Sequence, residues 1–115
     1  MTGAGAERIA ALWLQLKGWR IVARRLAGKR GSGVGEVDLI AKRGAVLAFV
    51  EIKYRPTQAQ AAQAVTVNQR QRIVRAAKAF ISANPAYNSH IVRFDAVLVA
   101  PRSWPRHVIN AWPEY

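Results

Sequence analysis

The first twenty residues carry apolar side chains at helical spacing. They recur three or four positions apart, which places them on one face of a helix: Ile9, Leu12, Trp13 and Leu16. Gly18 follows as a natural stop, because glycine readily adopts the left-handed conformation that ends many helices. The pattern therefore predicts a helix from Glu7 to Leu16, with the four apolar side chains facing the core.

Five further segments are rich in β-branched and apolar residues, and they predict strands over residues 19–26, 34–42, 46–54, 91–100 and about 106–112. Between the third and fourth strands, Thr66 and Gln69 form a capping-box pair that begins a helix ending near Asn84, ahead of a proline. The order α-β-β-β-α-β-β predicts one α/β domain over residues 1–115, with a mixed β-sheet flanked by helices.

The chain is strongly basic, with 18 Lys and Arg against six Asp and Glu and a net charge of +12. Such a charge attracts polyanions, so nucleic acid, DNA above all, is the first partner to expect. A basic structural protein that never meets DNA is the alternative. No cysteine is present, which excludes disulfides and thiolate metal sites. The N-terminus lacks a long apolar run, and we expect a soluble, cytoplasmic protein without a membrane partner.

Gly44-Ala45 separates the two central strands. A two-residue loop with glycine first is typical of a type II′ hairpin turn. A turn of this length pairs Arg43 with Val46 and sets the register of both strands.

This register places Asp38 opposite Glu51 and Glu36 opposite Lys53. Because side chains alternate between the faces of a sheet, all four project from the same side. Directly opposed Cβ atoms are about 4.5–5.5 Å apart. Two carboxylates at that separation repel one another unless one is protonated or a cation lies between them.

A divalent cation would resolve this repulsion. Oxygen ligands without cysteine or a histidine pair favour Mg²⁺ or Mn²⁺ over zinc. Lys53, two residues beyond Glu51 on the same face, can stabilise charge on a phosphate, so the arrangement suits phosphodiester hydrolysis. The alternative is an ion-pair ladder on a solvent-facing strand. Leu47 and Phe49 share the face of Glu51 and indicate a partly covered surface instead.

Asp38 followed by Glu51-Ile52-Lys53 resembles the D…ExK signature of the restriction-endonuclease-like, or PD-(D/E)xK, nuclease superfamily. More closely, GEVDLIA, FVEIKYR and RFDAVLV resemble the YraN-like family of small bacterial proteins, which is related to archaeal Holliday-junction resolvases. The resemblance extends from Gly5 through Asp95. Residues 24–35 depart from the family's pattern, where an Asn-containing segment would be usual.

The resemblance implies a restriction-endonuclease-like core and a metal-dependent endonuclease acting on branched or structured DNA. It makes Asp38 and Glu51 metal ligands and Lys53 the catalytic lysine. It also implies that Glu7 reaches the metal site, although an acidic residue in the first turn of a helix is favoured by the helix dipole alone. Glu36 either supplements the metal site or pairs with Lys53. A catalytically silent nucleic-acid-binding accessory module is the alternative function.

Several remaining features have their own interpretation. The glycine-rich residues 28–35 fit neither a P-loop nor a dinucleotide fingerprint, so we expect no nucleotide cofactor. Asp95 is expected to form a salt bridge with an arginine, and the isolated His107 to lie on the surface. The apolar C-terminal residues 104–115 offer a candidate homodimer interface. The candidate nucleic-acid contacts are Arg24, Arg25, Lys29, Arg30, Arg70, Arg72, Arg75 and Lys78.

Overall fold

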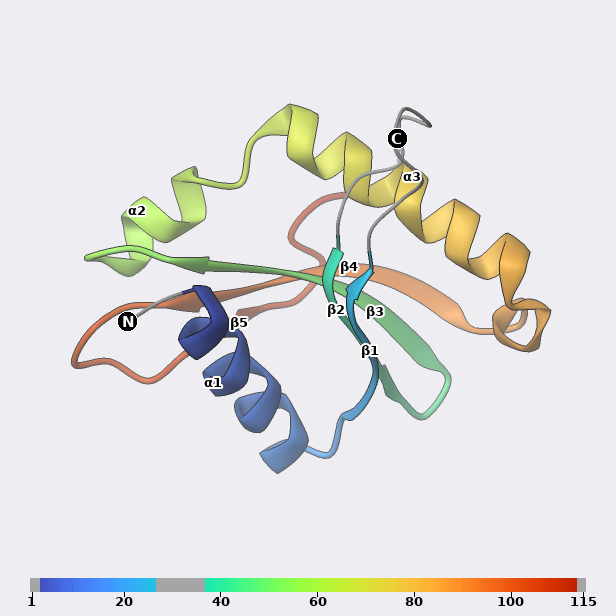
Figure 1. Ribbon diagram of the computed structural model, residues 1–115, viewed down its shortest axis with the longest axis horizontal. Helices are drawn as coiled ribbons and strands as arrows, with labels where there is room; N and C mark the ends of the chain where they lie inside the picture. Colours follow the sequence, from blue (N-terminus) through green and yellow to red (C-terminus); the bar gives the residue numbers. More distant parts are fainter. Residues whose placement is uncertain (1–2, 27–36, 114–115) are drawn as a thin grey trace.

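The computed structural model describes residues 3–26 and 37–113, and it contains a five-stranded sheet with helices on both faces (Figure 1). In chain order the elements are α1 (Gly3–Leu16), β1 (Arg20–Leu26), β2 (Val37–Arg43), β3 (Val46–Tyr54), α2 (Gln58–Gln63), α3 (Val67–Ala83), the 3₁₀ turn η1 (Pro85–Tyr87), β4 (Ile91–Val99) and β5 (Arg106–Val108). Within these ranges, no helix is long and apolar enough to cross a membrane.

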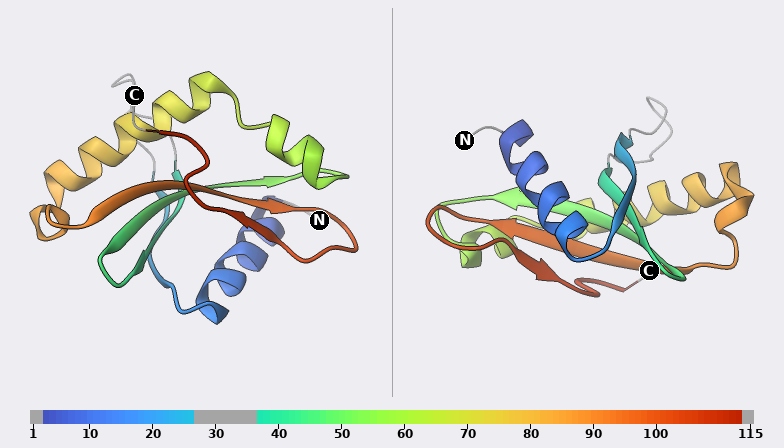
Figure 2. Two further views of the ribbon diagram at one scale, coloured as in Figure 1. Left: turned by 180° about the vertical axis from the view of Figure 1, so that it is seen from behind. Right: turned by 90° about the horizontal axis from the view of Figure 1, so that it is seen from below.

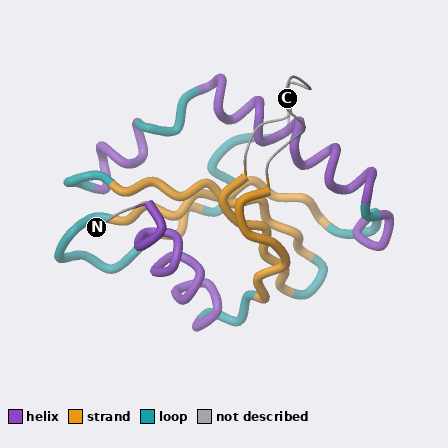
Figure 3. Tube along the Cα trace, viewed as in Figure 1, coloured by secondary structure: helices purple, strands orange, loops and turns teal. Residues whose placement is uncertain are grey.

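The strands lie in the order β1-β2-β3-β4-β5, in one layer between the helices (Figure 3). Only β3 and β4 are parallel; the other neighbours in this sheet are antiparallel. Parallel neighbours need a crossover connection, and α2 and α3 provide it by returning the chain to the start of β4. The predicted mixed sheet flanked by helices is confirmed.

Two hydrophobic cores lie on opposite faces of the sheet, and Figure 2 shows α1 on one of these faces and α3 on the other. One joins α1 to the sheet through residues such as Leu14 and Val50. The other joins α3 to the opposite face through Ile73 and Phe49. Because both faces are covered, β3 is buried along most of its length, which explains its nearly continuous apolar sequence.

The buried face of α1 differs from the predicted one. Leu12 and Leu16 are 58% and 74% exposed. The residues that face the sheet are smaller: Ala6, Glu7, Ala10, Ala11 and Leu14. Alanines at this spacing let the helix backbone approach the sheet closely, whereas the periodicity of bulky residues pointed to the neighbouring face. The end of the helix was predicted correctly, since Gly18 has a φ of +91°.

The helical crossover contains one more helix than predicted. The short α2 lies in the Gln/Ala-rich segment and is capped by Thr57, whose Oγ1 accepts a hydrogen bond from the Gln60 backbone N–H at 3.1 Å. The predicted cap of the longer helix is confirmed, because Thr66 Oγ1 accepts from the Gln69 N–H at 3.2 Å. Two N-caps within ten residues explain why the chain forms two helices instead of one.

The last strand is shorter than the predicted segment 106–112, because the chain turns where Asn110 adopts a φ of +52°. Trp112 then packs in the core on the α3 side, with its ring stacked on Phe94 at a centroid distance of 6.0 Å. Trp104 is 78% exposed. The candidate dimer segment is therefore partly occupied by packing within the chain.

Candidate functional site

The central hairpin has the predicted register. Arg43 pairs with Val46 and Leu39 pairs with Val50. Gly44 has a φ of +57°, and the second turn residue has no positive φ, as a type II′ turn requires. The pairing of β2 with β3 ends at Leu39 and Val50, and Asp38 and Glu51 are the next residues beyond this pair, where the two strands separate.

Asp38 and Glu51 form an interacting pair of carboxyl groups. Glu51 is only 4% exposed, and burial, followed by the hydrogen bond and the charge of Asp38, raises its pKa to about 9, although Lys53 acts in the opposite direction. The Ile52 backbone N–H donates to Asp38 Oδ2 at 2.8 Å, which holds this carboxylate beside the end of β3. A burial this complete contradicts the alternative of an ion-pair ladder on a solvent-facing strand.

A cavity of about 310 Å³ opens beside this pair. Glu7, Asp38 and Lys53 line it, together with Arg25. Glu51 is buried and lies outside the set of described residues that line the cavity. The structure therefore brings together one carboxylate from α1, one from β2 and the lysine of β3, three residues that are far apart in the sequence.

Glu7 is held by Arg25, whose Nε donates to Glu7 Oε2 at 2.8 Å. Because α1 begins at Gly3, Glu7 lies beyond the first turn, and the helix dipole no longer accounts for its position. The side chain of Arg25 remains 60% exposed and lines the cavity. Arg25, predicted as a nucleic-acid contact, is thus also the partner of an acidic residue.

The predicted Mg²⁺ or Mn²⁺ site can be compared with the positions of the acidic side chains that the structure describes. In the ranges that the structure describes, no three Asp, Glu, His or Cys side chains form a group that could hold a metal ion. Glu36 lies outside the described residues. The Asp38–Glu51 pair nevertheless fits Mg²⁺, which binds through one or two carboxylates plus waters and substrate phosphates. In the absence of a cation, the raised pKa of Glu51 means that a proton neutralises the pair instead.

The predicted nucleic-acid contacts are divided between several surfaces. Arg72, Arg75 and Lys78 are exposed on α3, which packs on the face of the sheet opposite α1. Arg70 is half-buried, and its Nε is enclosed without a hydrogen-bond partner. Arg24 is exposed on β1. The remaining two, Lys29 and Arg30, lie outside the described residues.

Asp95 is the centre of a second charged cluster and is fully buried. Arg93 Nε and Nη2 donate to its carboxylate at 3.0 and 2.9 Å, which confirms the expected salt bridge. His107 Nε2 lies 2.7 Å from Asp95 Oδ2, and the Asn110 N–H donates to Oδ1 at 3.1 Å. Burial raises the pKa of Asp95, but the hydrogen bonds from His107, Arg93 and Asn110 outweigh it and bring the pKa below the ordinary value of 3.8.

The predicted surface position of His107 is wrong, because its side chain is only 6% exposed. No motif links His107 to Asp95 in the sequence, since they lie on neighbouring strands whose pairing is non-local. The one available signal was the single acid within the apolar strand 91–100, which had to find a partner.

Known proteins similar to this chain share almost its whole length. A family model described as "Uncharacterised protein family UPF0102" matches residues 6–99. A UPF0102 protein of Paramagnetospirillum magneticum is 56% identical over 110 residues, covering 96% of this chain and 85% of the relative. UPF0102 proteins of Methylobacterium nodulans and Nitrobacter winogradskyi are 48% and 47% identical, covering 97% and 96% of this chain and 84% and 90% of those proteins. The matched region contains Glu7, Asp38, Glu51 and Lys53, and the chain belongs to the UPF0102 family, the YraN-like family that its motifs resemble.

Proposed function

We propose that this protein is a metal-dependent endonuclease with a restriction-endonuclease-like core, which hydrolyses phosphodiester bonds in branched or structured DNA. The observation that carries the proposal is the buried Asp38–Glu51 pair, next to a cavity that Lys53 also lines. Two interacting carboxyl groups at the end of an apolar hairpin cost the folded protein free energy unless a partner compensates them. The net charge of +12 supports a polyanionic substrate.

Each residue of the site would have its own role. Asp38 and Glu51 would hold Mg²⁺ or Mn²⁺, and such an ion supplies Lewis-acid stabilisation of a phosphate and lowers the pKa of water. Lys53 would place its ammonium against a phosphate oxygen and stabilise the negative charge that develops there. Glu7 would orient Arg25, so that the exposed guanidinium at the cavity rim meets a neighbouring phosphate.

Cleavage of labelled linear, single-stranded, flapped and four-way DNA tests the proposal. Each substrate is incubated with Mg²⁺, Mn²⁺ or EDTA, using the wild type, Asp38→Asn and Lys53→Met. Arg106→Gln, an exposed position on β5, is the control for loss of a positive charge. We expect metal-dependent cleavage by the wild type and the control, and a loss of about 100-fold or more in the two site variants. Cleavage that persists in EDTA, or in both site variants, would refute the assignment.

A catalytically silent binding module is the second candidate. The observation that favours it is the lack, within residues 3–26 and 37–113, of three side chains grouped as metal ligands. On this hypothesis DNA binding is retained and weakens steeply with salt, as phosphate contacts require, but no substrate is cut with either metal. Salt-dependent binding without cleavage in the same panel would therefore select the accessory role over the enzyme.

A further inference from the structure

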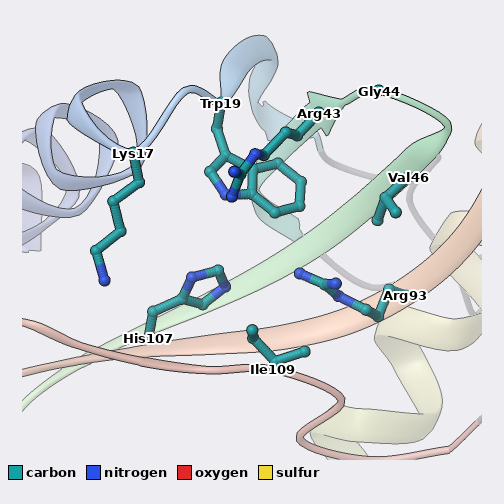
Figure 4. A pocket seen from close by; sticks show the side chains of 8 residues that line it. All are labelled: Lys17, Trp19, Arg43, Gly44, Val46, Arg93, His107 and Ile109. Atoms are coloured by element: carbon teal, nitrogen blue, oxygen red, sulfur yellow. The ribbon is translucent and has the colours of Figure 1, made fainter.

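A second cavity, of about 520 Å³, lies at the other end of α1 from the carboxylates (Figure 4). It is formed where the C-terminal end of α1 meets the turn between β2 and β3 and the edge formed by β4 and β5. The residues that line it are Lys17, Trp19, Arg43, Gly44, Val46, Arg93, His107 and Ile109. The residues with formal charge in this set are all basic, in contrast to the cavity that Glu7 and Asp38 line.

Three cations reach this cavity from separate elements. Lys17 follows α1, Arg43 ends β2 and Arg93 lies on β4, and Figure 4 shows the three side chains around the cavity. The Lys17 ammonium lies 4.7 Å from the centroid of the Trp13 ring. Gly18 lies next to one of them, since a Cβ atom at this position would be 3.7 Å from Arg43 Nε, which is an ordinary van der Waals contact. The chain reversal after α1, where Gly18 has a φ of +91°, thus places the Arg43 side chain close to the backbone.

Asp95 is buried and holds two of the side chains that line the cavity, Arg93 and His107. Its buried carboxylate binds Arg93 through Nε and Nη2, so the remaining Nη1 takes no part in these bonds. The same carboxylate lies 2.7 Å from His107 Nε2. Three cations against one carboxylate leave a formal charge of +2 around the cavity, with His107 counted as neutral. Arg93 and His107 are therefore preorganised, which lowers the entropic cost of binding an anion.

Trp19 forms an apolar floor beneath these charges. The indole is buried, its ring centroid lies 5.2 Å from the guanidinium carbon of Arg93, and His107 meets it edge-on at 5.9 Å. Because Arg93 already covers the ring, the indole is not available to stack on a nucleobase. An apolar floor also strengthens the attraction between the cations and an anion, since the local dielectric constant is lower than that of water.

We propose that this cavity binds a phosphate monoester, the group carried by the end of a phosphorylated nucleic-acid strand and by a free mononucleotide. The formal charge of +2 matches the dianionic monoester better than the single charge of an internal phosphodiester. Glu7 and Lys17 are ten residues apart, which corresponds to about 15 Å along a helix, so this site is separate from the carboxylate cavity. The inference goes beyond the proposed endonuclease activity and does not require turnover.

Binding in EDTA tests this site without any cleavage. The affinities of one oligonucleotide carrying a terminal phosphate and of the same oligonucleotide with hydroxyl ends are measured by fluorescence anisotropy, for the wild type, Arg43→Gln and Lys17→Gln. Arg106→Gln removes the same charge from an exposed position outside the cavity and is the matched control. Competition by a nucleoside 5′-monophosphate distinguishes the end of a phosphorylated strand from a free mononucleotide as the source of the phosphate group.

We expect the phosphorylated oligonucleotide to bind about tenfold or more tightly than the unphosphorylated one, the difference typical of one charged hydrogen bond. Arg43→Gln and Lys17→Gln should each reduce this ratio, whereas Arg106→Gln should weaken both ligands equally and preserve it. The Trp19 indole N–H signal in an NMR titration should shift with the phosphorylated ligand. The proposal is overturned if the wild type has no preference, if both cavity variants keep it, or if the Trp19 signal does not move.

The competition experiment then assigns the ligand. Displacement of the phosphorylated oligonucleotide by the mononucleotide supports a site that also accepts free nucleotides, and resistance to it supports strand-end recognition. Since EDTA removes the metal, these ratios are independent of cleavage. A failed nuclease assay with a preserved binding ratio would therefore refute the proposed enzyme alone, and the opposite pair of results would refute this site alone.

Discussion

Replacing Glu51 by glutamine should stabilise the metal-free protein at neutral pH and above. Glu51 is 4% exposed beside Asp38, and burial and this neighbour raise its pKa to about 9 from an ordinary value of 4.5. Glutamine is nearly isosteric and neutral at every pH. Its amide can donate to Asp38 as the protonated carboxyl group does, so the substitution retains the contact and removes only the ionisation.

The magnitude follows from proton linkage. Between pH 4.5 and about 9, the folded protein holds one proton on Glu51 that the unfolded chain has lost. The free energy of unfolding therefore decreases as the pH rises, by about 1.4 kcal/mol per pH unit. The contribution of this group is complete below pH 4.5 and is lost progressively toward pH 9. At pH 7 the accumulated loss is about 3 kcal/mol, which is large for a small domain.

Urea unfolding in EDTA at acidic, neutral and mildly alkaline pH measures this effect. The wild type should lose stability as the pH rises, while Glu51→Gln should show a flatter profile and exceed the wild type by about 3 kcal/mol at pH 7. Glu7→Gln alters another carboxylate of the site but keeps Glu51, and it should keep the wild-type slope. Mg²⁺ or Mn²⁺ should restore stability to the wild type and less so to Glu51→Gln. A variant that is less stable than the wild type at alkaline pH, or that has the same slope, would refute the reasoning.

Substitutions at three further positions test the fold, each by urea unfolding. Asp95→Asn should lower the free energy of unfolding by about 3–5 kcal/mol at pH 7, because Arg93 and His107 lose their buried partner. Since the pKa of Asp95 is lowered, the wild type should also lose stability as the pH falls below 3.8. The same loss of stability at acidic pH in the variant would contradict this. Gly44→Ala should cost about 1–2 kcal/mol from its φ of +57° alone, because no atom lies within 4 Å of the added Cβ; a much larger loss would mean that the turn is packed. Thr66→Ala should cost about 1 kcal/mol by removing the cap of α3, while Thr66→Ser should be close to the wild type, and equal losses in both would point to packing instead.

Interactions between residues close in the sequence determine much of the fold and the centre of the candidate site. The bounds of β3 and the register of the central hairpin were predictable because side-chain alternation and a glycine-first turn act over a few residues. That register is enough to place Asp38 opposite Glu51 before any tertiary contact is known. The cap at Thr66 was predictable for the same reason, since both partners lie within one helical turn.

Other features depend on how distant elements pack. The sequence pattern could not show that α1 buries its alanines, because the choice of face depends on how closely the helix approaches the sheet. Nor could it bring Glu7 to Arg25, or His107 to Asp95, because those contacts follow from non-local packing and strand pairing. The amino-acid pattern thus specifies the carboxylate pair and its lysine. The two cavities, one that joins two carboxylates to three basic side chains and one whose charged residues are all basic, exist only once α1 lies across the folded sheet and brings residues from both ends of the chain beside the hairpin.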